Sequence, residues 1–174
     1  MIHITNNLLK ETELSVIQNI CENFETFEVD SPKGNENNNS YNRVFVDDAK
    51  LQTYYHDLIN YLEQTIDKNK FEILEFPKPK TWINKVIPET NKNDSFHYDM
   101  SFLTAITYLN EDFIGGEFTY INEFGGTTKL NPKMNKTLIM DKNLYHKVSP
   151  VLSGVRFSLV TFFNFNAKNT KTIV

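Results

Sequence analysis

The chain has 174 residues, of which 40% are hydrophobic and 23% are charged, a composition typical of a folded domain that excludes wholesale disorder. The net charge of −4 argues against a strongly basic nucleic-acid footprint at the level of the whole chain, and the single cysteine excludes both an intramolecular disulfide and a thiolate-rich zinc site. No apolar run is long enough to span a membrane, and the N-terminus lacks the pattern of a secretory leader. We therefore expect a soluble protein in the cytoplasm.

Two amphipathic helices are predicted in the first part of the chain. Apolar residues recur at steps of three and four from Leu14 to Phe24, which predicts a helix over residues 11–23 with one buried face. A second helix is expected after Asp47 or Asp48, either of which can cap its first turn. Its buried stripe consists of Leu51, Tyr54, Leu58, Leu62 and Ile66.

A polar segment separates two short stretches, 27–30 and 43–46, that are predicted to be extended. Residues 31–42 have no periodicity and almost no apolar side chains, which predicts a flexible loop. Long loops of this kind inside a compact domain usually have a function or are disordered.

After residue 70 the pattern changes to the period of two that is typical of strands. Strands are predicted at residues 71–76, 82–87, 102–109, 117–121, 127–130, 137–140 and 155–165. Many short strands at this spacing favour an α+β fold that is mainly β, namely a barrel, sandwich or jelly roll with the helices outside. We expect one domain over residues 1–174, with residues 1–70 as helical support and residues 71–166 as the β core.

Two histidines and one aspartate form a candidate metal site. His97 and Asp99 are two positions apart, so their side chains share a face if the segment is extended. His146 follows after several predicted strands and can supply a third ligand. Two imidazoles and a carboxylate leave half of an octahedron open, which suits a non-haem Fe(II) that also holds a cosubstrate and dioxygen. A His-x-Asp pair also arises often by chance, so the pair alone leaves a structural role open.

The last predicted strand places an arginine among apolar side chains. Arg43 and Arg156 are the only arginines in a chain whose other cations are lysines. Arg156 and Ser158 share a strand face with Val160 and Phe162, so the guanidinium is expected to point inward. A buried arginine is costly unless it meets an anion. The anion can be a ligand carboxylate, or a distant carboxylate of the chain in a structural salt bridge.

Together these segments resemble the Fe(II)- and 2-oxoglutarate-dependent dioxygenases, in particular the prolyl-4-hydroxylase-like branch. The resemblance covers residues 82–165. It rests on Phe96-His97-Tyr98-Asp99, Ile106-Thr107-Tyr108-Leu109-Asn110, Gly115-Gly116-Glu117-Phe118, His146-Lys147-Val148-Ser149-Pro150-Val151 and Gly154-Val155-Arg156-Phe157-Ser158. Each piece is weak alone, but five in this order at compatible spacing are specific.

The resemblance implies a double-stranded β-helix, which is a distorted jelly roll, with iron at its mouth. It implies that His97, Asp99 and His146 are the iron ligands. It further implies that Arg156 binds the distal carboxylate of 2-oxoglutarate, with Ser158 as a helper and Tyr108 as a hydroxyl donor. The expected cofactor is Fe(II) and the expected cosubstrate is 2-oxoglutarate, and a need for ascorbate stays open.

The substrate implied by the resemblance is a peptidyl prolyl residue, which would make a protein or peptide the partner. We expect no membrane partner, and the acidic charge balance argues against a nucleic acid. Tyr41, Arg43, Trp82 and Met100 are candidate substrate contacts, and a core role is the alternative for Trp82 and Met100. Relatives often carry a tyrosine and a Pro-Gly pair before the first histidine, where this chain has residues 86–90, Val-Ile-Pro-Glu-Thr. Another side chain, a free amino acid or a nucleobase therefore remains an alternative substrate, and a non-catalytic jelly-roll binding module remains an alternative function.

In relatives the loop at the position of residues 31–42 folds over the peptide. We therefore predict that shortening residues 34–39 spares iron binding, 2-oxoglutarate binding and substrate-uncoupled decarboxylation, yet impairs hydroxylation of the true substrate. Side-by-side assays of succinate release and of product formation check this. Unchanged product formation by the shortened chain would show that the segment is only a spacer.

Overall fold

The computed structural model describes residues 1–23, 28–30, 41–65, 79–88 and 95–163, and for residues 28–30, 41 and 42 it describes the backbone only. The helical elements are α1 (Glu11–Glu22), the short 3-10 helix η2 (Asp48–Lys50) and α2 (Gln52–Thr65). The strands are β1 (Ile2–Asn6), β2 (Glu28–Asp30), β3 (Tyr41–Phe45), β4 (Lys80–Val86), β5 (Leu103–Tyr108), β6 (Ile114–Gly115), β7 (Phe118–Ile121), β8 (Thr127–Leu130), β9 (Lys136–Asp141), β10 (His146–Val148), β11 (Val151–Ser153) and β12 (Arg156–Phe163).

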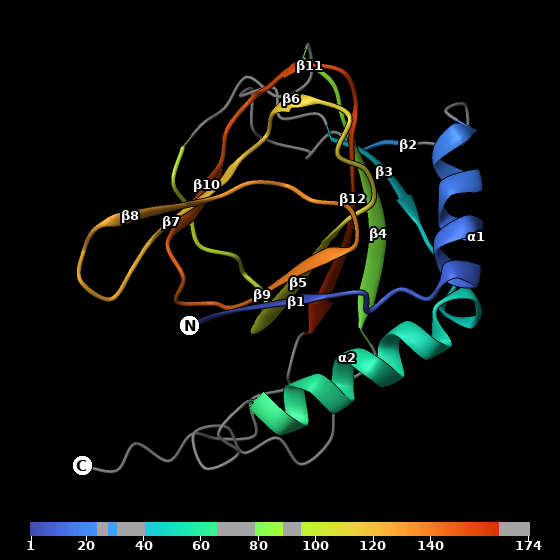
Figure 1. The fold of residues 1–174 in the computed structure, drawn as a ribbon, viewed down its shortest axis with the longest axis horizontal. Coiled ribbons are helices and arrows are strands. Elements are labelled where there is room, and N and C mark those ends of the chain that lie inside the picture. Colours follow the sequence, from blue (N-terminus) through green and yellow to red (C-terminus); the bar gives the residue numbers. More distant parts are fainter. Residues whose placement is uncertain (24–27, 31–40, 66–78, 89–94, 164–174) are drawn as a thin grey trace.

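The strands form a large antiparallel sheet that faces two small ones. The large sheet has the order β1-β9-β5-β12-β4-β3-β2, and the small sheets have the orders β10-β7-β8 and β11-β6. Figure 1 shows α1 and α2 on one side of the large sheet and the β7-β8 hairpin on the other. The chain is therefore an α+β jelly roll that is mainly β, as the sequence predicted.

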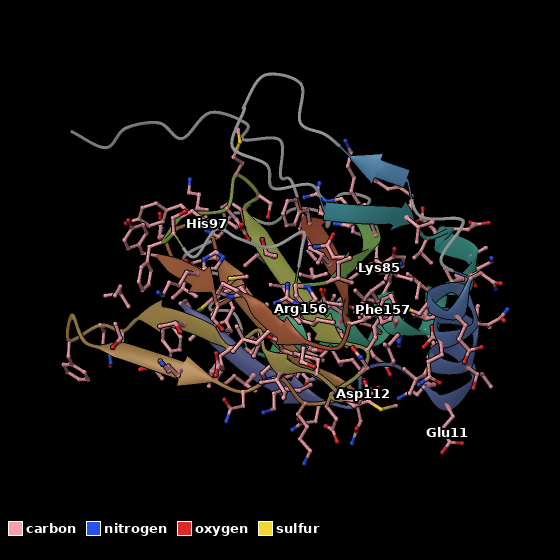
Figure 2. The ribbon with its side chains drawn as sticks, turned by 90° about the horizontal axis from the view of Figure 1, so that it is seen from above. Glu11, Lys85, His97, Asp112, Arg156 and Phe157 are labelled. Atoms are coloured by element: carbon pink, nitrogen blue, oxygen red, sulfur yellow. The ribbon has the colours of Figure 1, made fainter. Side chains whose placement is uncertain are left out.

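The two faces of β12 divide the interior into a hydrophobic core and a cavity. Phe157, Leu159 and Phe163 join the core that α1 and α2 cover. Arg156 and Ser158 point the other way, because successive side chains of a strand leave it on opposite faces. Figure 2 shows this at the start of β12, with Phe157 on the side of α1 and Arg156 on the side of His97.

A buried carboxylate joins the two helices. Glu13 of α1 is 8% exposed, and its Oε1 accepts a hydrogen bond of 2.8 Å from the backbone N–H of Tyr54, in the first turn of α2. The first N–H groups of a helix have no partner inside the helix, so this contact satisfies one of them. In the described part of the chain, no helix is both long and apolar enough to cross a membrane.

The N-terminal region contributes more strand than the sequence predicted. β1 pairs with β9, which follows it by more than a hundred residues, so no local pattern reveals the pairing. The expected polar loop over residues 31–42 is wrong at its end, because Tyr41 and Asn42 belong to β3 and pair with Asp30 and Val29. Residues 31–40, the predicted strand 71–76, and the ends of the predicted stretches at Phe24, Ile66 and residues 164–165 lie outside the described residues.

The buried face of α1 carries the single cysteine. Cys21 is 6% exposed, and burial raises the pKa of its thiol to about 12. Because the thiolate is the reactive form, we predict that the native protein does not react with a thiol reagent such as Ellman's reagent at mildly alkaline pH, and that it reacts once unfolded in guanidinium. A variant with Ser15→Cys, on the exposed face of α1, serves as the control and should react at one thiol while folded. Rapid reaction of native Cys21 would contradict the packing of α1.

Candidate functional site

The candidate metal centre is built where two distant segments meet. The backbone N–H of His97 donates to the carbonyl of His146 at 2.8 Å, and the N–H of His146 donates to the carbonyl of His97 at 3.0 Å. His97 forms this isolated bridge, and an extended strand on which His97 and Asp99 would share a face is not among the described strands. The bridge replaces the strand as the device that brings the ligands together, because it fixes the two histidines side by side.

Both imidazoles are held in the tautomer that suits metal binding. The Nδ1 of His97 lies 3.2 Å from the carbonyl of Ser95, and the Nδ1 of His146 lies 2.9 Å from the carbonyl of Leu144. A carbonyl can only accept, so each Nδ1 carries a proton, and in the neutral form of each ring it is Nε2 that has the lone pair. Burial also lowers the pKa of His146, which favours its neutral form.

Asp99 completes the cluster. Its Oδ1 lies 3.9 Å from the Nε2 of His97 and 3.8 Å from the Nε2 of His146. One ligand atom from each of the three residues lies within 4.8 Å of the other two. The other oxygen of Asp99, Oδ2, accepts a hydrogen bond of 2.6 Å from the hydroxyl of Thr104. Two nitrogen lone pairs and one carboxylate oxygen therefore converge on one place, and this donor set fits Fe(II).

A cavity of about 180 Å³ opens between this cluster and the large sheet. It is lined by Arg43, Trp82, Asn84, Ser95, His97, Asp99, Thr104, Ile106, Tyr108, His146, Val148, Arg156, Ser158, Val160 and Phe162. Asp99 is the only acidic residue among these lining residues. Apart from that carboxylate, the described wall presents the guanidinium groups of Arg43 and Arg156 together with hydroxyls, imidazoles, one amide and apolar groups, which suits an anionic ligand.

One part of the cavity wall is suited to a carboxylate. Arg156 is 6% exposed, Ser158 is 2% exposed, and Ser158 pairs across the sheet with Tyr108. Burial raises the pKa of Tyr108 to about 12, so its hydroxyl is protonated near neutral pH and can donate a hydrogen bond. A guanidinium and two hydroxyls thus lie on adjacent strands of one buried wall.

Gly116 gives the guanidinium its space. Its φ of +68° is unfavourable for other residues, and a Cβ at this position would lie 3.3 Å from Cδ and 3.4 Å from Nη1 of Arg156. In the sequence the Gly115-Gly116 pair is part of the motif that carries the family resemblance. The structure adds a close approach to Arg156, which no local sequence pattern reveals.

The adjoining part of the cavity wall is aromatic and rich in donors, and its Asn84 pairs across the sheet with Ser158. The guanidinium carbon of Arg43 lies 5.1 Å from the centre of the Trp82 ring, and Phe162 packs edge-on against Trp82 with ring centres 4.7 Å apart. The indole N–H of Trp82 donates to Oδ1 of Asn84 at 2.8 Å, which leaves the amide N–H groups of Asn84 to act as donors. This wall offers an apolar surface beside polar hydrogen-bond donors.

The remaining sequence-predicted residues fall elsewhere. Met100 is fully exposed and does not line the cavity, so the structure gives it neither a core role nor a place in the wall. Tyr41 is described only as the first residue of β3. Thr104 and Asn84 line the cavity although sequence reasoning did not select them. The period of two could have found them, because they share strand faces with Tyr108 and Trp82 respectively.

No protein-family model matches the sequence, and no curated protein sequence is significantly similar to it. Solved structures are similar in fold. A prolyl-4-hydroxylase from Pseudomonas putida superposes with a TM-score of 0.73 at 16% identity, over 94% of this chain and 92% of that one. A prolyl hydroxylase from Trichoplax adhaerens, in complex with a peptide fragment of hypoxia-inducible factor, gives 0.69 at 14% identity, over 94% and 83%.

A third similar structure has another activity. A non-haem alpha-ketoglutarate-dependent carbocyclase from nogalamycin biosynthesis superposes with a TM-score of 0.59 at 14% identity, over 94% of this chain and 79% of that one. At these identities the likeness establishes architecture. The chain has the jelly-roll fold that prolyl hydroxylases and other 2-oxoglutarate-dependent Fe(II) oxygenases share.

Proposed function

We propose that this protein is an Fe(II)- and 2-oxoglutarate-dependent dioxygenase that hydroxylates a C–H bond. The observation that carries the proposal is the convergence of the Nε2 atoms of His97 and His146 with Oδ1 of Asp99 at a cavity that also contains Arg156. A structural histidine pair would need neither the open cavity nor a buried cation facing it. The similar fold of known oxygenases supports the same assignment.

Each group of residues has a distinct task in this proposal. His97, Asp99 and His146 hold the iron, and Arg156, Ser158 and Tyr108 hold the distal carboxylate of 2-oxoglutarate by charge-assisted hydrogen bonds. Bound iron supplies the redox chemistry that converts 2-oxoglutarate and dioxygen to succinate and carbon dioxide and places the second oxygen atom on the substrate. The protein contributes orientation and exclusion of water, and no side chain has to act as a nucleophile or general base.

We further propose that the substrate is a peptidyl prolyl residue. The edge-on pair of Trp82 and Phe162 offers an apolar surface for a pyrrolidine ring, and Arg43 and Asn84 offer donors for peptide carbonyls. The similar fold of the prolyl hydroxylases from Pseudomonas putida and Trichoplax adhaerens supports this class of substrate. Another side chain, a free amino acid or a nucleobase remains the alternative.

The proposed function is tested by succinate release from 2-oxoglutarate with Fe(II) and oxygen, with and without a panel of candidate substrates. Proline-containing peptides should raise succinate release and gain one oxygen atom by mass spectrometry. If only free amino acids, or only nucleobases, raise succinate release, the substrate belongs to that class and not to the peptidyl prolines. If the protein with Fe(II) releases no more succinate than Fe(II) without protein, the assignment as a dioxygenase is rejected.

The three metal ligands should act as a unit. We predict that His97→Ala, Asp99→Ala and His146→Ala each abolish tight binding of Fe(II) and 2-oxoglutarate turnover while the fold is retained, because each removes one of three protein ligands. Anaerobic metal titration and circular dichroism measure the two effects. His56→Ala is the matched control, since the His56 side chain is 73% exposed on α2. A ligand variant that keeps normal affinity would show that its residue does not hold the metal.

Arg156 should control cosubstrate affinity. Arg156→Lys keeps the charge but loses the planar fork, so we predict that binding of 2-oxoglutarate weakens by about 1–3 kcal/mol. Tyr108→Phe should show a smaller loss in the same direction. Calorimetric titration with 2-oxoglutarate in the presence of an inert divalent metal measures both, with the exposed Lys129→Ala as control. Equal affinity for 2-oxoglutarate in the wild type and in Arg156→Lys would show that the distal carboxylate of 2-oxoglutarate does not bind Arg156.

A further inference from the structure

The two carboxylate oxygens of Asp99 have different surroundings. Oδ1 faces the Nε2 atoms of both histidines, at 3.9 Å and 3.8 Å. Oδ2 accepts the hydrogen bond of 2.6 Å from Thr104. A carboxylate can bind a metal through one oxygen or through both. In this site the second oxygen, Oδ2, already accepts a hydrogen bond from the protein.

The hydroxyl that holds Oδ2 is itself fixed. Thr104 is 1% exposed, and its backbone pairs with Phe162 of β12 on one side and with Met140 of β9 on the other. A β-branched side chain on such a strand has few accessible rotamers. The Thr104 hydroxyl can therefore act as a rigid donor.

A second buried hydroxyl supports the first. Ser101, which is 1% exposed, lies 2.9 Å from Oγ1 of Thr104 and donates to the carbonyl of Leu103 at 2.7 Å. Because the single proton of Thr104 is directed to Asp99, the Thr104 oxygen is the acceptor toward Ser101, whose proton is shared between its two partners. This chain of hydrogen bonds fixes the turn that joins the ligand segment to β5.

We propose that Thr104 is a positioning residue that reserves Oδ2 of Asp99 and so makes Asp99 a ligand through Oδ1 alone. The inference rests on the proposed function, because it concerns the metal that His97, Asp99 and His146 would hold. One oxygen from Asp99 leaves three positions of an octahedral ion for cosubstrate and dioxygen. Binding through both oxygens would consume one of the three.

The test compares Thr104→Val, which removes the hydroxyl and keeps the shape, with Thr104→Ser, which keeps the hydroxyl. Thr137→Val is the matched control, because Thr137 is equally buried and its hydroxyl bonds Thr107 at 2.7 Å, away from the cavity lining. The probe is Co²⁺, titrated anaerobically into each protein without 2-oxoglutarate. Its affinity and its visible spectrum, which reports the number and kind of ligands, are both measured, and thermal unfolding is followed separately.

Thr104→Val should weaken Co²⁺ binding by about 10- to 100-fold and change the spectrum, since partners that orient a metal ligand have effects of this size. Thr104→Ser should restore both properties, and Thr137→Val should change stability alone. Wild-type affinity and spectrum in Thr104→Val, or no restoration by Thr104→Ser, would overturn the role of Thr104. These outcomes are independent of turnover. A wild type that binds Co²⁺ but releases no succinate would reject the proposed function and leave the Thr104 result standing, whereas a wild type that binds no Co²⁺ would overturn both.

Discussion

A single pair of backbone hydrogen bonds joins His97 to His146, and the candidate metal centre depends on it. The two segments are far apart in the sequence, and this bridge lies beside ring contacts of Tyr145 with Phe96 and Tyr98. It holds the two imidazoles with ring centres 4.5 Å apart. Each ring is then oriented by a carbonyl two residues before it. The backbone therefore sets position, tautomer and direction before any metal arrives, which reduces the reorganisation that binding requires.

The two faces of the large sheet have different roles. One face packs against α1 and α2 and supplies most of the apolar burial, while the other supplies the cavity wall. Because Phe157 and Leu159 are buried in the core, Arg156 and Ser158 cannot rotate away from the cavity without unpacking β12. The stability of the helical layer is thus coupled to the geometry of the site, and a second, smaller cluster around Phe118 and Leu138 supports the opposite side.

The features of the fold and the site that could be predicted from the sequence are those that follow from local periodicity. The alternation along β12 correctly separated Arg156 from Phe157, and the stripe from Leu51 to Leu62 correctly marked the buried face of α2. Features that depend on partners outside the local segment could not be predicted from the sequence. They include the pairing of β1 with β9 and the hydrogen bond from Thr104 to Asp99. The close approach of Gly116 to Arg156 belongs to the same class, because it joins two segments that are distant in the sequence.

The central claim is that the cavity couples dioxygen to 2-oxoglutarate at a metal held by His97, Asp99 and His146. The most direct test is turnover of 2-oxoglutarate with Fe(II) under dioxygen labelled with oxygen-18, followed by mass spectrometry of the succinate. The account predicts succinate that carries one labelled oxygen atom in the wild type, and none above background in His97→Ala. Unlabelled succinate, or the same labelled yield from both proteins, would contradict it.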